Sequence, residues 1–420
     1  MNATTESQEQ SIELGYSKHA AIVLLTFTVL ASRRPDAIFH AQFWAEDGRV
    51  WFANAYNLGW WPALLRAQDG YFQTLPRLGA SLALLVPLSL APLVLNLIAM
   101  SVQVLPVNLL LSARSSWLGN LYSRALFAGL YVVLPNCREI SANITNSQWV
   151  MALCLFLVLV ASTSRSVVGR TLDISILLLG GLTGPFCLFL LPIALFMAWR
   201  QHDRWRWVLA CTLAAVCLVQ AGALIYGYSI RPHYPLGASP LLFMRILGGH
   251  IYLGTLAGYN TLAAHAGLLE SSFLLCLATG GTIIVAICFR KSPVEMKLFL
   301  LFSATLFAVS LIFSETYPPP GMTVWASLAG APSNRYWFFP TLAFAWSLLS
   351  CLRSRTAYLR LVSAYLLGLM CIGIYRDWRH PAFRDFHFAE YVKRLEAAPV
   401  GTAIIIPVNP EGWDMRLVKH

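Results

Sequence analysis

Charged side chains are scarce in this sequence. Only 12% of its 420 residues are Asp, Glu, Lys or Arg, whereas 57% are hydrophobic and the mean hydropathy is +0.62. A typical soluble domain carries about 25% charged and about 45–50% apolar residues. The composition therefore excludes an ordinary soluble protein. Long apolar runs predict an all-α polytopic membrane protein, because backbone groups in lipid must bond within their own segment.

Acidic residues are the scarcer charge: 19 Asp and Glu stand against 30 Lys and Arg, for a formal net charge of +11. In a soluble protein this excess would suggest nucleic-acid binding. Here the basic residues cluster in short loops between apolar runs, which is typical of cytoplasmic loops. Nucleic acid is therefore not an expected partner.

Paired cysteines and common catalytic motifs are also lacking. The nine cysteines form no CxxC pair and have no regular spacing, so neither a disulfide framework nor a zinc site is indicated. No Walker loop, GxSxG or HExxH motif is present. Residues 1–18 lack the basic start of a cleaved signal peptide, so we expect residues 20–32 to be a retained first span.

The apolar runs predict a bundle of about ten to twelve transmembrane helices. Clear runs are 19–32, 92–112, 149–163, 207–228, 267–289, 298–314, 337–352 and 360–375, with shorter runs at 125–135 and at 78–91, the latter split from its neighbour by Pro87 and Pro92. Basic loops near Arg170, Arg204, Lys291 and Arg355 are all expected on the cytoplasmic side. Arg33 and Arg34 lie on the wrong side of the first span for this rule.

Residues 172–199 predict a broken helical hairpin. The run has basic loops at both ends, so it must return to the side from which it started. About 28 residues cannot cross a membrane twice at 1.5 Å per residue. We expect the turn at Gly184-Pro185 and the hairpin to be buried or to line a cavity, because broken helices survive at membrane depth only there.

The remaining segments are expected on the external face. These are 33–77, 136–148, 229–266, 315–336 and the tail after Arg376. The tail predicts a helix near 386–397, a strand at Thr402–Pro407 and a turn at 409–412. We therefore divide the chain into a transmembrane domain, 1–376, whose first external loop (33–77) carries juxtamembrane helices, and a small α/β external segment, 377–420.

Two adjacent carboxylates, Glu46 and Asp47, stand among aromatic residues in the stretch "FWAEDGRVWFANAYNLGWW". They are candidates for a general base, since a carboxylate can take a proton from a hydroxyl. As an alternative, they cap a juxtamembrane helix. Adjacent helical residues point about 100° apart, so only one is expected to face a substrate, and Asp47 is favoured.

Other external polar residues are candidates for binding. Arg77, Arg231 and Arg335 suit a phosphate, because the guanidinium fork fits two oxygens, although Arg77 and Arg335 could equally be snorkelling arginines. Candidates for binding a sugar or an acceptor are Asp69, Tyr71, Asn143, Asn146, Gln148, His250 and Tyr336. Turn formation is the alternative for Asn143 and Asn146, and packing is the alternative for His250.

The sequence resembles the GT-C superfamily of integral-membrane glycosyltransferases. The hallmark of that family, an acidic pair in the first external loop, is matched by Glu46-Asp47 in "WAEDG". The resemblance continues through "GYFQTLPRLGA", "NITNSQW", "LTGPFCLFLLP" and "NRYWFFP", and covers the chain to about Arg376. It implies a GT-C-like bundle in a bacterial inner membrane with a periplasmic or extracellular active face. The implied donor is a polyprenyl-phosphate-linked sugar, and the acceptor is a cell-surface glycan or lipid.

The resemblance also implies a mechanism, a single inverting displacement. Asp47 or Glu46 would act as base, and Arg77 or Arg335 would offset charge on the departing phosphate. Asn143, Asn146 and Gln148 would bind sugar hydroxyls, and the hairpin 172–199 would hold the isoprenoid. No cofactor is certain. A divalent cation, Mg²⁺ or Mn²⁺, held by Asp47 and Glu46 stays open, because the superfamily includes enzymes with and without a metal.

Two other functions stay open. One is a transporter or flippase of a lipid-linked or small polar substrate, which would place charged residues at mid-span and show repeat symmetry. The other is a surface-polysaccharide polymerase or ligase, which would carry a large external loop near its C-terminal half. Almost no ionisable residue lies deep in an expected span, and the loops 229–266 and 315–336 are modest in length. Both features favour the glycosyltransferase.

Overall fold

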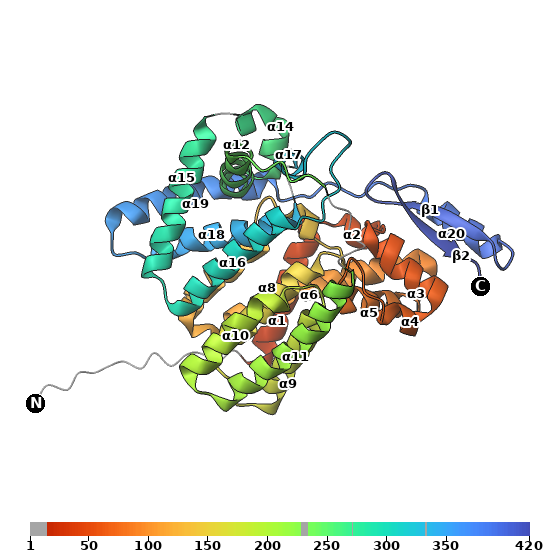
Figure 1. Ribbon diagram of the computed structural model, residues 1–420, viewed down its shortest axis with the longest axis horizontal. Helices are drawn as coiled ribbons and strands as arrows, with labels where there is room; N and C mark the ends of the chain where they lie inside the picture. Colours follow the sequence, from red (N-terminus) through yellow and green to blue (C-terminus); the bar gives the residue numbers. More distant parts are fainter. Residues whose placement is uncertain (1–14, 228–233, 271, 332–333) are drawn as a thin grey trace, which may run out of the picture.

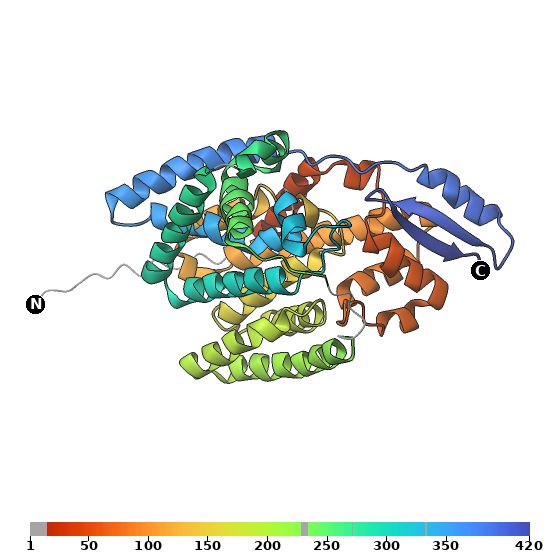
Figure 2. The ribbon, with the colours of Figure 1, turned by 45° about the horizontal axis from the view of Figure 1, so that its top comes forward.

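The computed structural model describes residues 15–227, 234–270, 272–331 and 334–420. It is a helical bundle with a two-stranded antiparallel sheet near the C-terminus (Figure 1). Helices α9, α10 and α11 lie on one side of the bundle and α15, α18 and α19 on the other, as the turned view also shows (Figure 2). The predicted helical class is confirmed, and so is a small C-terminal segment that contains both helix and strand.

The N-terminal half contains α1 (Tyr16–Arg33), α2 (Asp36–Phe39), η1 (Asp47–Phe52), α3 (Ala53–Leu58), α4 (Trp60–Leu64), α5 (Thr74–Ala83), η2 (Leu88–Leu90), α6 (Ala91–Leu111), η3 (Ala113–Leu118), α7 (Leu121–Val132), η4 (Arg138–Ile140), α8 (Ser147–Val160), α9 (Val167–Gly181), α10 (Cys187–Gln201) and α11 (Arg204–Gly227). The C-terminal half contains α12 (Pro240–Met244), η6 (Arg245–Leu253), α13 (Gly254–Ala257), α14 (Tyr259–Ala264), η7 (Ala266–Glu270), α15 (Phe273–Lys291), α16 (Val294–Ile312), α17 (Val324–Gly330), η8 (Arg335–Trp337), α18 (Phe338–Leu352), α19 (Ala357–Arg376), α20 (Phe388–Ala397), β1 (Ala403–Val408) and β2 (Trp413–Val418).

In the part of the chain that the structure describes, six helices are long and apolar enough to cross a membrane. They are Leu88–Leu111, Arg204–Gly227, Pro240–Ala257, Phe273–Lys291, Val294–Ile312 and Ala357–Arg376. These helices indicate an integral membrane protein. The helix at Pro240–Ala257 lies inside the segment 229–266, in which we expected no span, and it is an additional candidate by length and composition. The helix escaped notice because its mean hydropathy, 1.2, is the lowest of the six.

The broken hairpin is confirmed, with α9 and α10 as its arms. Each arm has 15 residues and is therefore about 22 Å long, short of the roughly 30 Å hydrocarbon core. The turn between them contains Gly184, whose φ of +89° suits glycine. Its N–H donates to the Phe72 carbonyl at 3.0 Å, and the Thr74 N–H donates to the Leu182 carbonyl at 3.0 Å. The hairpin turn is thus tied to the end of the loop 33–77.

Several of the basic loops lie together at one end of the bundle, which we call the basic end. Arg353 donates to the Leu118 carbonyl at 2.8 Å, and Lys291 donates to Thr356 at 3.3 Å. Arg114, which lies in η3 together with Leu118, forms an ion pair of 2.8 Å with Asp173 on α9. The opposite end carries the C-terminal segment, and we call it the tail end.

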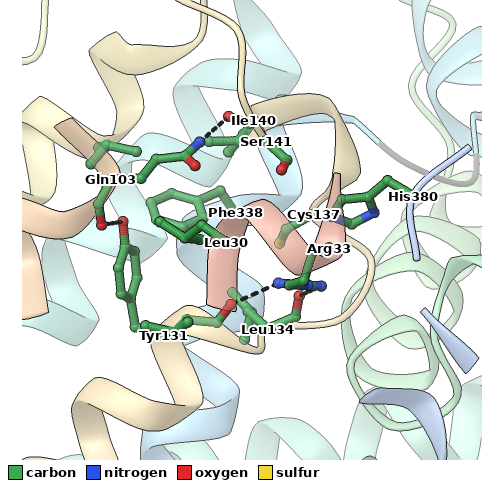
Figure 3. Close-up of a pocket in the computed structure, with 12 residues that line it drawn as sticks. Leu30, Arg33, Gln103, Tyr131, Leu134, Cys137, Ile140, Ser141, Phe338 and His380 are labelled. Atoms are coloured by element: carbon green, nitrogen blue, oxygen red, sulfur yellow. Dashed lines mark hydrogen bonds between the residues drawn. The ribbon is translucent and has the colours of Figure 1, made fainter. Parts of the chain in front are cut away.

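Arg33 and Arg34, which broke the pattern of basic loops, are buried structural residues. The Arg33 guanidinium donates to the carbonyls of Val132 at 2.7 Å and Leu134 at 3.1 Å, beside a small cavity of about 40 Å³ (Figure 3). Arg34 donates to the Ser141 carbonyl at 3.2 Å. Both side chains satisfy carbonyls at the end of α7 and in the following loop. They therefore carry no information on membrane orientation.

The C-terminal segment packs against the loop 33–77 (Figure 1). Strands β1 and β2 pair antiparallel with Ala403 opposite Val418. A second, smaller core joins the two regions through Phe43, Trp51, Phe52, Phe388, Ile406, Met415 and Leu417. The predicted helix, first strand and turn of this segment are confirmed. Strand β2 was not predicted, although its residues alternate apolar and charged side chains, a pattern typical of a half-buried strand.

Candidate functional site at the tail end

A cavity of about 260 Å³ lies between the hairpin and α16, with a polar mouth toward the loop 33–77. Its apolar part is lined by Trp149, Pro185, Phe186, Leu188, Phe189, Leu224, Leu306, Val309 and Phe313. Its polar lining residues are Tyr71, Gln148, Ser310, Glu315, Arg335 and Tyr336. Four of these, Tyr71, Gln148, Arg335 and Tyr336, are among the residues predicted from the sequence. The cavity is suited to an amphiphile with one apolar and one polar end.

Arg335 carries the positive charge of this mouth. Its Nη1 lies 3.1 Å from Glu139 Oε1, and its backbone N–H donates to Glu139 Oε2 at 2.8 Å. Burial alone would lower the pKa of Arg335, but Tyr336, Glu139 and Glu46 more than offset it and raise that pKa well above its usual value. The guanidinium is therefore charged at any working pH and still 22% exposed. It can meet an anionic group of a substrate.

The charge of Glu46 is also coupled to that of Arg335, after the charge of Glu139, which forms the ion pair. Within the described residues its carboxylate has no side-chain hydrogen-bond partner and only its own backbone N–H as donor. Burial raises the pKa of Glu46 above its usual value, Arg335 lowers it, and the carboxylates of Asp69 and Glu139 raise it further. Such a group takes up and releases protons more easily at neutral pH than an exposed glutamate does.

Asp47 is engaged differently, although it is adjacent in sequence. It is 1% exposed and accepts from the backbone N–H groups of Ile144 at 3.3 Å and Thr145 at 2.9 Å, and from the Thr145 hydroxyl at 2.5 Å. Burial raises the pKa of Asp47 to about 7, against the opposing effect of these hydrogen bonds. Asp47 thus fixes the turn before α8. Of the two candidates for a base, Glu46 is the one whose charge is coupled to that of the arginine.

Asn143 and Asn146 belong to the turn that Asp47 holds. Both side-chain amides donate to the Glu139 backbone carbonyl, at 2.5 and 3.0 Å, and the side-chain Oδ1 of Asn143 accepts from the Asn146 backbone N–H at 2.9 Å. These bonds fit the alternative of turn formation. They also place Glu139 against Arg335. Neither asparagine lines the cavity, so their role toward a sugar stays a prediction.

Two tyrosines and Glu315 close the mouth beside Arg335. The Tyr71 hydroxyl donates to Glu315 Oε2 at 3.0 Å, and the Glu315 N–H donates to the Tyr336 hydroxyl at 2.9 Å. Gln148 accepts from the Gln73 amide at 3.2 Å. Asp69 lies in the preceding turn with a φ of +52° and acts on Glu46 through its charge. The arrangement provides hydroxyl and amide groups of the kind that bind sugars.

Arg77 is near the acidic pair but outside the cavity. It is 1% exposed, its guanidinium lies 5.0 Å from the centre of the Trp51 ring, and none of its N–H groups has a hydrogen-bond partner among the described residues. Trp51 in turn donates to Thr145 at 2.9 Å, the threonine that binds Asp47. Arg77 does not line the cavity, so its position does not support phosphate binding directly, and that role stays a prediction.

His250 and Arg231 complete the predicted set. His250 is fully buried in η6, where its Nε2 lies 2.7 Å from the Ala329 carbonyl and its ring stacks on Trp337. This fits the packing alternative and not a substrate contact. Arg231 lies outside the described residues, so its predicted role has no structural description.

Glu139, Glu315 and Trp149 were not among the predicted site residues. Glu315 lies at the mouth, Trp149 lines the apolar part of the cavity, and Glu139 pairs with Arg335. Glu139 precedes Asn143 by four residues in the same external stretch, and Glu315 is the first charged residue after α16. Trp149 lines the cavity, and its Nε1 has no partner among the described residues. All three stand in or beside segments that the sequence predicts to be external, and that position was the available signal.

The acidic pair is poorly suited to hold a divalent cation. Both oxygens of Asp47 accept hydrogen bonds from donors, and the charge of Glu46 is coupled to an arginine. A cation there would displace N–H and O–H donors from a buried carboxylate. Across the described residues no group of three or more His, Cys, Asp or Glu could hold a metal ion.

A polar groove of about 400 Å³ lies on the same end, between η1, α3 and β2. It is lined by Arg49, Ala53, Asn54, Asn57, Asp414, Arg416 and Val418. Asn57 exchanges two hydrogen bonds with β2, donating to the Arg416 carbonyl at 2.8 Å and accepting from the Val418 N–H at 2.9 Å. The groove therefore exists only because the C-terminal segment packs on the loop 33–77.

Taken together, the tail end combines an apolar cavity, an arginine at its mouth, a carboxylate coupled to that arginine and a polar groove nearby. This arrangement can bind an amphiphile by an anionic head and present a base beside it. No protein-family model matches this sequence, and no curated protein sequence is significantly similar to it.

Proposed function

We propose that the protein is a membrane glycosyltransferase of the GT-C type. It moves a sugar from a polyprenyl-phosphate donor to a cell-surface glycan or lipid acceptor. The observation that carries this proposal is the cavity at the tail end, which is apolar along the hairpin and ends at Arg335, whose charge is coupled to Glu46. Isoprenoid, phosphate and acceptor hydroxyl each find a matching chemical environment there.

The donor lies with its isoprenoid against the apolar wall and its phosphate at Arg335. Phe186, Leu188 and Phe189 at the start of α10 and Leu306 and Phe313 on and after α16 supply that wall. The guanidinium fork matches two phosphate oxygens. Tyr71, Gln148 and Tyr336 are within reach of the sugar hydroxyls, because they line the same mouth.

The reaction is a single displacement with inversion at the sugar carbon. Glu46 takes the proton of the acceptor hydroxyl while that oxygen attacks the anomeric carbon from the face opposite the phosphate. The bond between the anomeric carbon and the phosphate oxygen breaks, and its electron pair stays on the phosphate. Arg335 stabilises the charge that develops there. Asp47 holds the turn that carries Glu139 and so positions Arg335.

The proposal includes a topology of about ten to twelve spans, in which shorter helices such as α8 and α10 cross or enter the membrane beside the six long ones. The basic end is cytoplasmic, following the distribution of Lys and Arg in short loops. The tail end faces the periplasm or the exterior of a bacterial inner membrane. The polar groove at Arg49 and Asn57 offers a path for the acceptor toward Glu46.

Mass spectrometry of the cell-surface glycan tests the proposal. A deletion strain is complemented with the wild-type protein, with Glu46→Gln or with an empty vector, and the amount of protein in the membrane is measured. We expect the wild type to restore one sugar that both the deletion and Glu46→Gln lack. A glycan restored in full by Glu46→Gln, with the protein present at the wild-type level, overturns the proposal and favours a transporter.

A further inference from the structure

A second cavity lies at the basic end, far from the acidic pair. Its volume is about 340 Å³, and it is formed by η3, the turn between α15 and α16, and the end of α18. It is lined by Ser116, Trp117, Leu118, Gly119, Phe127, Lys291, Ser292, Pro293, Met296, Ser350 and Arg353. None of these residues takes part in the function proposed above.

The lining of this cavity is rich in hydrogen-bond donors and carries positive charge alone. Lys291 and Arg353 are its two ionisable groups, and three serine hydroxyls stand with them. The indole Nε1 of Trp117 is buried and has no hydrogen-bond partner among the described residues. Glu295 is the nearest acid in sequence and does not line the cavity.

Arg353 is held in place by the structure around it. Its Nη1 donates to the Leu118 carbonyl at 2.8 Å and to the Ser123 hydroxyl at 2.7 Å. Gly119 lies against the guanidinium, since a Cβ there would approach Arg353 Nη2 to 2.7 Å, and its φ is +100°. The positive φ favours glycine at this position. The guanidinium therefore keeps one orientation, with Nη2 left for another acceptor.

The first turn of α16 adds to the positive electrostatic potential in this cavity. This helix has 19 residues and begins at Val294, between the lining residues Pro293 and Met296. Its first backbone N–H groups have no partners within the helix, and the helix dipole favours an anion near them. Two cations, the hydroxyl-bearing side chain of Ser116 and the start of a long helix thus line one space, and Glu295 in the first turn of that helix does not line it.

We propose that this cavity binds a phosphate group. Phosphate oxygens accept from arginine, lysine, hydroxyl and backbone donors, and no carboxylate in the lining opposes the anion. The apolar residues Leu118, Phe127 and Met296 form the remaining wall, which suits the glycerol and first methylenes of a phospholipid. A membrane lipid headgroup and free phosphate share this chemistry, and the experiment separates them.

The test uses the full-length protein in mild detergent and native mass spectrometry. Short-chain phosphatidylglycerol, diacylglycerol with the same chains, and inorganic phosphate are titrated separately. We expect phosphatidylglycerol to bind and diacylglycerol to bind much more weakly. Competition by inorganic phosphate at millimolar concentration would identify free phosphate as the source, whereas no competition would identify the lipid headgroup. Equal binding of phosphatidylglycerol and diacylglycerol overturns the proposal.

Matched variants show where the phosphate binds. Lys291→Gln and Arg353→Gln each lower the affinity by about tenfold or more, the loss expected for one charge-assisted hydrogen bond. Arg355→Gln, an exposed arginine two residues further on that does not line the cavity, leaves the affinity unchanged. The side chain of Lys291 hydrogen-bonds only to the Thr356 hydroxyl among the described residues, so Lys291→Gln is expected to keep the fold even if Arg353→Gln does not. Unchanged affinity in Lys291→Gln contradicts the assignment.

Discussion

The cavities at the two ends of the molecule differ in one respect that decides their chemistry. The tail-end cavity pairs its arginine with carboxylates, Glu139 at 3.1 Å and Glu46 through its charge. The basic-end cavity has Lys291 and Arg353 and no carboxylate in its lining. A cation beside a carboxylate can bind an anion while the carboxylate takes up a proton, whereas the basic-end cavity offers cations that bind an anion and no carboxylate base.

A second contrast exists within the tail end, between two neighbouring residues. Both carboxylate oxygens of Asp47 accept hydrogen bonds from the turn before α8, whereas Glu46 has no side-chain hydrogen-bond partner in the described chain. One carboxylate therefore stabilises the fold and the other is available for chemistry. The following predictions test both contrasts, beginning with the largest effect.

Loss of Glu46 should have the largest effect. Glu46→Gln lowers sugar transfer by about 10²–10⁴-fold, the usual contribution of a general base, and leaves the melting temperature unchanged. Transfer is measured in membranes with a radiolabelled lipid-linked sugar pool. Glu396→Gln, an exposed glutamate of α20, serves as the control and retains full transfer. If Glu46→Gln transferred sugar at the wild-type rate, Glu46 would not be the base, and the tail-end cavity would have a binding role only.

Removal of Arg335 should lower transfer by about 10–100-fold and change its pH dependence. Glu46 must be ionised to act as base, so transfer falls as the pH drops through its raised pKa. Arg335 opposes that rise, so Arg335→Gln raises the pKa of Glu46 further and moves the acidic limb of the pH profile to higher pH. If Arg335→Gln lowered the rate of transfer without shifting the acidic limb of the pH profile, Arg335 would not set the pKa of Glu46.

Asp47→Ala should lower the free energy of unfolding by about 1–3 kcal/mol, because the buried N–H groups of Ile144 and Thr145 lose their acceptor. Asp47→Asn keeps one acceptor oxygen and should lose less. Thermal unfolding in detergent measures both. If Asp47→Asn abolished transfer while unfolding at the wild-type temperature, the division of roles between Asp47 and Glu46 would be reversed.

The smallest effect is expected for the contact between the C-terminal segment and the loop 33–77. Asn57→Ala removes two hydrogen bonds to β2 and should cost about 0.5–1.5 kcal/mol for each. Limited proteolysis should then cleave the C-terminal segment faster. Asn54→Ala, on the same helix and in the same groove, is the matched control and should be cleaved at the wild-type rate.

Much of the architecture could be predicted from charge and hydropathy along the chain. Basic residues on both sides of 172–199 sufficed to predict the hairpin, because topology and helix rise leave no other path. The helix at Pro240–Ala257 could not be predicted in this way, since its glycines, His250 and Tyr252 dilute its hydropathy.

The candidate site was predictable only in part. The external ends of spans indicated Arg335, Tyr71, Gln148 and Tyr336 as residues of one face. The division between Glu46 and Asp47 depends on a turn 97 residues further along the chain, and no local pattern contains that information. The burial of His250 depends in the same way on its contact with Ala329 across the fold.

The central claim is that the tail-end cavity holds a lipid phosphate at Arg335, and photo-crosslinking tests it most directly. A polyprenyl phosphate with a photoactivatable group next to the phosphate is irradiated with the full-length protein in membranes, and labelled peptides are mapped. The account predicts label at the start of α10, the end of α16 and η8, competed by unlabelled polyprenyl phosphate and strongly reduced in Arg335→Gln. Label confined to the basic end, or unchanged in Arg335→Gln, would contradict it.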